Sequence, residues 1–118
     1  MNSFLTAAIT THIAHVELRS PNFLPLHKLY DKIYRSCQDW YDRFAERVIA
    51  RGGNLPTFKY QQAPPVSNDR IKDVITALQV CRQELEAHRQ STDTVLVALI
   101  DAATEDVDKY IWQLNAST

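Results

Sequence analysis

The chain has 118 residues, of which 45% are hydrophobic and 23% are charged, and its formal net charge is -1. These values are typical of one compact domain covering residues 1–118, and they exclude a disordered chain or a collagen-like fibre. They show no basic excess of the kind that a dedicated nucleic-acid-binding protein carries. The longest apolar run, Val95–Ile100, is far shorter than the roughly 20 residues that span a bilayer.

Apolar residues recur at helical spacing from Phe4 to Val16, which predicts a short amphipathic helix of about 17 residues. After a break at residues 20–22, a helix of about 28 residues is predicted from about Leu24 to Arg51. Because the first helix is much shorter than the second, one end of the bundle should be open on one side, or covered by residues 54–66 or by another subunit. The second helix is expected to bury Leu26, Tyr30, Ile33, Tyr34, Cys37, Tyr41, Phe44 and Val48.

Glycines and prolines mark where the helices end. Gly52 and Gly53 are the only glycines, and they should end the second helix as a left-handed cap. Residues 54–66 contain three prolines and have no sustained period, so they are expected to form a crossover connection. Ser67-Asn68-Asp69 should cap a third helix that reaches about Gln90, and Ser91-Thr92-Asp93 should cap a fourth. Two short turns and one long connection predict an all-α, ferritin-like four-helix bundle with its crossover between the second and third helices.

The two cysteines, Cys37 and Cys81, lie singly within stretches of helical period. This arrangement does not indicate a disulfide framework. We therefore expect two buried free thiols, in a protein of the cytoplasm.

A polar stripe lies opposite the apolar face of the predicted second helix. At about 100° per residue, His27, Asp31, Asp42 and Glu46 fall within about 100° of one another. The two i,i+4 pairs that they form are about 22 Å apart along the helix axis, so both pairs of one copy cannot reach the same ion. They would converge if a second copy lay antiparallel across a twofold axis near Ser36–Cys37, which would produce two identical sites.

A second histidine could join this site from the first helix. His15 precedes the first turn and His27 follows it, so a helical hairpin could bring the two imidazoles together. The composite site would take its ligands from two subunits: His15, His27 and Asp31 from one, with Asp42 and Glu46 from the other. Mixed imidazole and carboxylate ligands suit iron, zinc or manganese. On spacing alone, a solvated helix face is the commoner explanation of such a stripe. The three-residue spacing of His12 from His15 could be accidental, so His12 is not counted among the ligands.

A long pattern of residues favours the metal site. The pattern consists of Thr11-His12-Ile13-Ala14-His15, Leu26-His27-Lys28-Leu29-Tyr30-Asp31 and Tyr41-Asp42-Arg43-Phe44-Ala45-Glu46-Arg47. It resembles the Dps-like mini-ferritins, whose signature has a His near the end of the first helix, a second His twelve positions later, an Asp four positions after that, and an Asp-x-x-x-Glu-Arg stretch. The matching positions are His15, His27, Asp31, Asp42 and Glu46, and residues 106–112 also resemble the last helix of that family.

The resemblance implies that these five residues form a ferroxidase centre shared across a twofold dimer interface. Fe(II) would be oxidised there, commonly by hydrogen peroxide and otherwise by oxygen, and ferric mineral would be stored inside a hollow dodecamer. Iron is therefore the expected metal, and a second copy of the chain is the expected partner. Metal binding should weaken in acid, because the histidines must be unprotonated. The chain departs from the family at Val16, where a Trp is usual.

Two other functions remain open. Many members of the family coat DNA, often through a Lys-rich terminal tail. Residues 1–10 and 115–118 contain no Lys or Arg, so DNA binding is possible but not favoured. The chain could also keep the fold as a scaffold without iron chemistry. A salt-dependent gel shift would detect DNA binding, and iron-oxidation kinetics would identify a scaffold.

Overall fold

The computed structural model describes residues 1–19, 23–61, 64–66 and 69–118. These residues form four helices and no strand: α1 (Ser3–Glu17), α2 (Phe23–Ala50), α3 (Ile71–His88) and α4 (Thr94–Ala116). The predicted all-α four-helix bundle is confirmed, and α2 lies within one residue of its predicted bounds at each end. No helix in this part of the chain is both long and apolar enough to cross a membrane.

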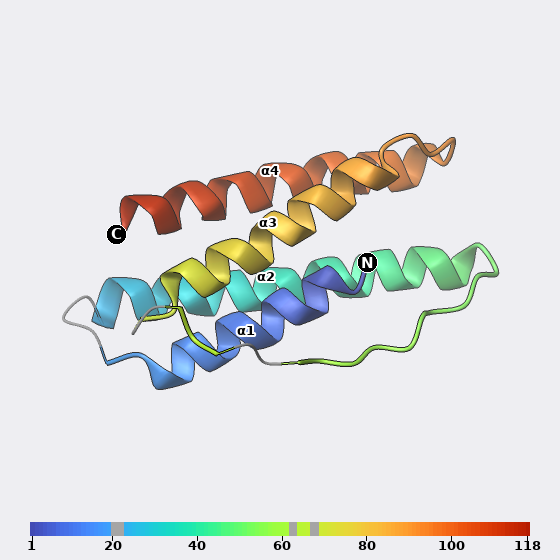
Figure 1. Cartoon of the computed structure of the whole chain (residues 1–118). Helices are drawn as coiled ribbons and strands as arrows, with labels where there is room; N and C mark the ends of the chain where they lie inside the picture. The colour runs from blue at the N-terminus through green and yellow to red at the C-terminus, as the bar shows by residue number, and fades with distance from the viewer. Residues whose placement is uncertain (20–22, 62–63, 67–68) are drawn as a thin grey trace.

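The helices are arranged as two hairpins, α1–α2 and α3–α4, which pack side by side (Figure 1). α1 packs against α2 and α3, and α4 packs against α3 and, less extensively, α2. The connection after α2 runs back along the bundle to the start of α3. This confirms the crossover that was predicted from the prolines of residues 54–66. The core contains large fully buried side chains from all four helices, among them Phe4, Tyr30, Leu78 and Ile100.

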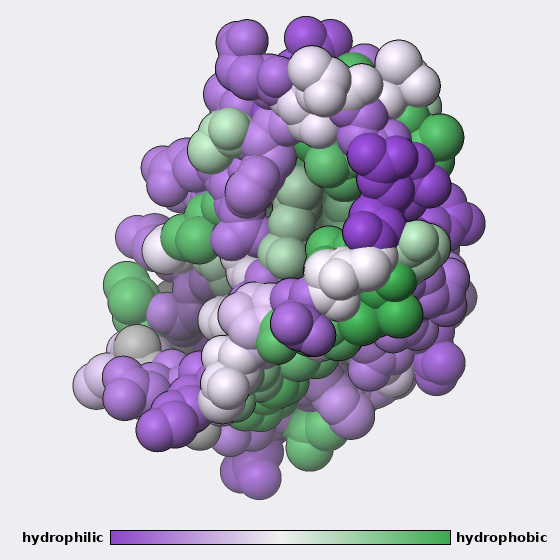
Figure 2. Space-filling model, turned by 90° about the vertical axis from the view of Figure 1, so that its right-hand side faces the viewer, coloured by the Kyte–Doolittle hydropathy of each residue, from purple (hydrophilic) through white to green (hydrophobic). Residues whose placement is uncertain are grey.

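One end of the bundle lies beyond the reach of α1, since α1 has 15 residues and α2 has 28. Figure 2 shows this end, where apolar surface lies between hydrophilic rims. Three large apolar side chains near the end of α2 and the start of α4 are exposed: Ile49, Leu55 and Val95. The unequal helix lengths expected from the sequence therefore leave part of this end uncovered within one copy.

The glycine pair ends α2 as predicted. Gly52 adopts a left-handed backbone with φ of +78°. Its N–H donates to the carbonyl of Ile49 at 3.0 Å, and the N–H of Gly53 donates to the carbonyl of Val48 at 2.9 Å. This double hydrogen bond satisfies the last carbonyls of the helix. A Cβ at Gly53 would lie only 2.9 Å from a methyl carbon of Val48, so the second glycine is needed for space.

The starts of α3 and α4 differ in how they are capped. The Asp93 carboxylate accepts hydrogen bonds from the backbone N–H groups of Val95 and Leu96, as predicted. At α3, Ser67 and Asn68 lie outside the described residues, and only Asp69 can be assessed. Its carboxylate accepts from the N–H of Ile71 at 3.2 Å, while Arg70 stands between them in a left-handed conformation.

The predicted apolar face of α2 needs one correction. Trp40 is buried, whereas Tyr41 and Val48, which were predicted to be buried, are only partly covered. At about 100° per residue, Trp40 lies on the same side of the helix as the buried Ile33 and Phe44, whereas Tyr41 lies at the edge of this face. The indole N–H of the buried Trp40 donates to Asp106 of α4 at 3.0 Å. Both cysteines are buried and free, as predicted, and burial raises the pKa of the Cys81 thiol to about 12.

An ion pair joins the end of α2 to the start of α4, and its strength should depend on pH. Two guanidinium nitrogens of Arg47 donate to the two oxygens of Asp93, at 2.7 and 2.9 Å. These hydrogen bonds hold the pKa of Asp93 at about 2, below its ordinary value of 3.8. A carboxylate with a lowered pKa stabilises the folded state above its unfolded pKa, and this contribution is lost as the pH falls toward 2.

We therefore expect the metal-free Asp93→Asn variant to be less stable than the wild type at about pH 6, and the two to converge near pH 2. Asn caps a helix about as well as Asp, so the variant removes the charge and keeps the cap. Urea unfolding midpoints of both proteins across this range would measure the difference. A difference that stays constant down to about pH 2 would contradict the assignment.

Candidate metal centre

The α1–α2 hairpin brings His15 and His27 together. His15 lies in the last turn of α1, and His27 lies near the start of α2. Their ring centroids are 3.9 Å apart, with the planes tilted by 34°. The two imidazoles therefore lie at the closed end of the hairpin, as its geometry predicted.

His15 is positioned to act as a neutral ligand. Both of its ring nitrogens are buried, and neither has a hydrogen-bond partner among the described residues. Burial lowers the pKa of His15, the nearby His27 lowers it further, and Asp31 opposes the shift. The imidazole is therefore uncharged at neutral pH, and its lone pair is free to bind a cation.

Asp31 supplies a negative charge beside these imidazoles. It lies four residues after His27, so the two side chains share one face of α2. One carboxylate oxygen, Oδ1, accepts from the Tyr34 hydroxyl at 3.0 Å and from Nε of Arg35 at 3.1 Å. These hydrogen bonds, that of Tyr34 first, hold the pKa of Asp31 below its usual value. Asp31 therefore places a negative charge close enough to His15 to oppose the lowering of its pKa.

Tyr34 is a site residue that the sequence analysis assigned only to the core. Its ring stacks on His12, with centroids 4.5 Å apart, and meets His15 edge-on at 5.4 Å. His12 itself is exposed. The three-residue spacing from Asp31 to Tyr34 is the signal that could have identified this contact.

Asp42 and Glu46 lie on the exposed side of α2, away from the histidines. Neither carboxylate has an ion pair or a hydrogen bond within the described part of the chain. The separation of about 22 Å between the two ligand pairs of α2 follows from its rise per residue. Within residues 1–19, 23–61, 64–66 and 69–118 of one copy, no three His, Cys, Asp or Glu side chains are arranged to hold an ion, and His15, His27 and Asp31 are no exception.

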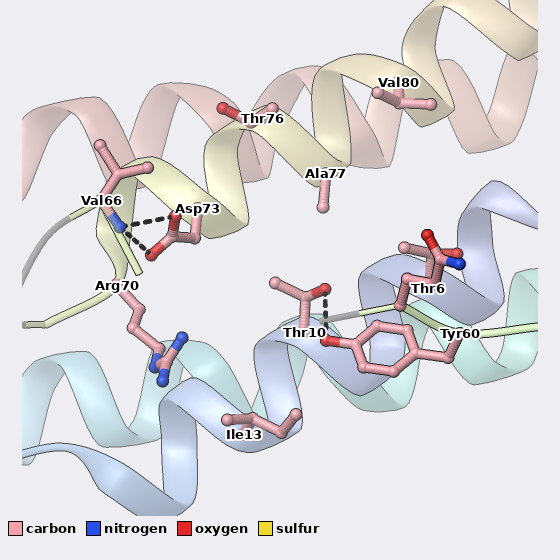
Figure 3. Close-up of a pocket in the computed structure, with 11 residues that line it drawn as sticks. Thr6, Thr10, Ile13, Tyr60, Val66, Arg70, Asp73, Thr76, Ala77 and Val80 are labelled. Carbon is pink, nitrogen blue, oxygen red and sulfur yellow. Dashed lines mark hydrogen bonds between the residues drawn. The ribbon is translucent and has the colours of Figure 1, made fainter. Parts of the chain in front are cut away.

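A separate cavity of about 290 Å³ lies between α1 and α3, beside the crossover (Figure 3). The hydroxyl of Tyr60 lies 3.4 Å from that of Thr10, and Asp73 accepts from the backbone N–H of Val66. Arg70, which also lines the cavity, forms an ion pair with Glu17 at 2.7 Å. The cavity contains none of the five predicted ligands, so it is distinct from the histidine cluster.

Comparisons with known proteins identify the family. The model of the ferritin-like domain matches residues 1–116. The DNA protection during starvation protein of Listeria monocytogenes is 27% identical, over 92% of this chain and 80% of the relative. The protein of the same name from Agrobacterium fabrum is 26% identical, over 97% of this chain and 80% of the relative.

Solved structures agree with the sequence relatives. Dps from Microbacterium arborescens in the high iron form aligns with a TM-score of 0.84 and 25% identity, over 98% of this chain and 85% of that one. Dps from Listeria monocytogenes shares the fold, with a TM-score of 0.81 and 24% identity, over 97% of this chain and 84% of that one. Given the family match over nearly the whole chain and these similarities, the chain belongs to the ferritin-like family, as a Dps-like mini-ferritin.

Proposed function

We propose that this protein is a ferroxidase that binds Fe(II), oxidises it and stores the ferric product. The observation that carries the proposal is the His15 imidazole, whose two buried ring nitrogens have no hydrogen-bond partner among the described residues and whose ring lies 3.9 Å from that of His27. An imidazole without hydrogen bonds is costly to bury, and a bound cation would satisfy it. Family membership and the similarity to a Dps structure in a high iron form support iron as the substrate.

The proposed ligands suit the chemistry of iron oxidation. With peroxide as oxidant, each of two Fe(II) ions gives up one electron, the O–O bond of one peroxide molecule breaks, and hydrolysis of the ferric product releases protons. The positive charge on iron rises during this reaction. The carboxylates Asp31, Asp42 and Glu46 would balance that charge, and neutral His15 and His27 would complete the coordination.

A second copy of the chain is needed to complete each site. Asp42 and Glu46 are exposed, have no ion pair or hydrogen bond to any described residue, and lie about 22 Å along the helix from His27 and Asp31. An antiparallel pair of α2 helices would bring each carboxylate pair to the histidines of the other copy, on both sides of a twofold axis. We propose this dimer as the unit of function, within the dodecameric shell that the family resemblance implies.

Mixed dimers of two inactive variants would test whether the site is shared. His27→Ala and Glu46→Ala should each abolish rapid iron oxidation. When both chains are co-expressed, half of the dimers are mixed and each mixed dimer has one intact site of two, so about a quarter of the wild-type rate should return. Stopped-flow absorbance of ferric product after peroxide addition would measure the rate.

The matched control combines two changes in the same half-site. Co-expression of His27→Ala with Asp31→Ala leaves every site damaged, whether the dimers are mixed or not, so no activity should return. Recovery by both combinations would contradict the shared site. Undiminished oxidation by the single variants would contradict the assignment of the ligands themselves.

DNA protection is the second candidate function, and the names of the curated relatives favour it. We propose that such protection works through removal of Fe(II) and peroxide rather than through coating of DNA. The formal net charge of -1 gives little electrostatic attraction to phosphates, which dominates non-specific DNA binding.

This mode of protection predicts a separation of two assays. The wild type should prevent nicking of plasmid DNA by Fe(II) and peroxide, and Glu46→Ala should fail to do so. Neither protein should retard the same plasmid in a gel at about 50 mM salt, where electrostatic binding is strong. A salt-sensitive gel shift shared by both proteins would instead favour direct coating.

A further inference from the structure

We infer that Tyr34 is a positioning residue of the histidine half-site, whose hydroxyl orients Asp31 and whose ring orients His15. This inference rests on the proposed ferroxidase function. Tyr34 is only 8% exposed and contacts residues of both helices of the hairpin. No other described side chain is shown touching both the carboxylate of Asp31 and the ring of His15.

The carboxylate contact leaves one oxygen of Asp31 free. Tyr34 and Arg35 both donate to Oδ1, at 3.0 and 3.1 Å. Within the described part of the chain, no hydrogen bond reaches the other oxygen, Oδ2, so its lone pairs remain available to a cation. The Arg35 side chain is 66% exposed, and exposed ion pairs constrain side chains weakly. The buried Tyr34 hydroxyl is therefore the donor that fixes the orientation of the carboxylate.

The ring contact replaces the usual support of a metal-binding histidine. Such a histidine commonly donates its second N–H to a carboxylate or a carbonyl, which fixes the ring orientation. His15 has no such hydrogen bond, because both of its nitrogens lack partners among the described residues. Its ring is held by aromatic contacts instead, with Tyr34 at 5.4 Å and His27 at 3.9 Å. Edge-on and tilted ring contacts of this kind are favourable and directional.

His12 completes this arrangement from the outside. Its ring lies nearly parallel to that of Tyr34, at an angle of 20° and a centroid distance of 4.5 Å. His12 is exposed while Tyr34 is buried, so His12 covers the tyrosine on the solvent side. We assign His12 a packing role, which any flat ring of similar size could fill.

An anaerobic Co(II) titration of the assembled protein tests the inference without iron oxidation. Co(II) binding is followed by calorimetry and by visible absorption, which reports the coordination geometry. Tyr34→Phe keeps the ring and removes the hydroxyl, so it should weaken Co(II) binding by about tenfold to a hundredfold and change the absorption spectrum. Helix content and oligomer mass should remain those of the wild type.

Tyr110→Phe is the matched control. Tyr110 on α4 is also 8% exposed, and its hydroxyl has no hydrogen bond within the described residues. Tyr110 is not among the described residues that contact His15, His27 or Asp31, so this variant removes the same group from an equally buried ring outside the histidine cluster. It should bind Co(II) with the affinity and spectrum of the wild type.

Two variants of His12 separate packing from coordination. His12→Phe keeps a ring over Tyr34 and should bind Co(II) like the wild type, while His12→Ala should bind more weakly. Equal losses in both variants would show that His12 acts as a ligand, which would overturn its packing role.

The outcomes also distinguish this inference from the proposed function. One outcome is that the wild type binds Co(II), Glu46→Ala does not bind it, and Tyr34→Phe binds it like the wild type. In that case the ferroxidase site stands and the role of Tyr34 is overturned. If the wild type binds neither Co(II) nor Fe(II), the proposed function fails, and the role of Tyr34 fails with it.

Discussion

The regular rise of one long helix limits what a single copy of this chain can do. α2 has 28 residues and carries four of the five proposed ligands on its outer side. Its rise of about 1.5 Å per residue places them in two pairs about 22 Å apart, so the two pairs of one copy cannot bind the same ion. If the proposed function is right, association is a chemical requirement of this protein, because each copy holds two incomplete halves.

The α1–α2 hairpin holds three of the five proposed ligands: His15, His27 and Asp31. The α1–α2 turn places His15 against His27, and burial removes water from the nitrogens of His15 without providing another partner. Burial also favours the neutral imidazole, which is the form that binds metals. The ionised Asp31 adds the negative charge that a cation needs. Among the described residues no hydrogen bond reaches the ring nitrogens of His15, and this supports the proposal that His15 binds a metal ion.

Elsewhere, single polar side chains connect helices that share little apolar contact. Trp40 joins α2 to α4 through its hydrogen bond to Asp106. Asp93 caps α4 and pairs with Arg47 at the end of α2. The pair of Arg47 with Asp93 lies beyond Phe44, the residue of α2 whose ring stacks on Phe4 near the start of α1. Polar contacts therefore fix the geometry of the bundle where burial alone provides less.

The sequence by itself determined the features that follow from local rules. Helical periodicity predicted the four helices and most of the buried face of α2, and Gly52-Gly53 predicted its end, because these depend on backbone geometry and neighbouring residues. The i,i+4 spacing of His27 with Asp31 and of Asp42 with Glu46 is likewise a property of one helix. Only the tertiary structure decided that Asp106 accepts the indole N–H of the buried Trp40, because the two residues are distant in the sequence and lie on different helices. The same holds for the role of Tyr34, because its ring is placed by His12 and His15 of another helix, and side-chain packing between helices is not encoded by spacing along either one.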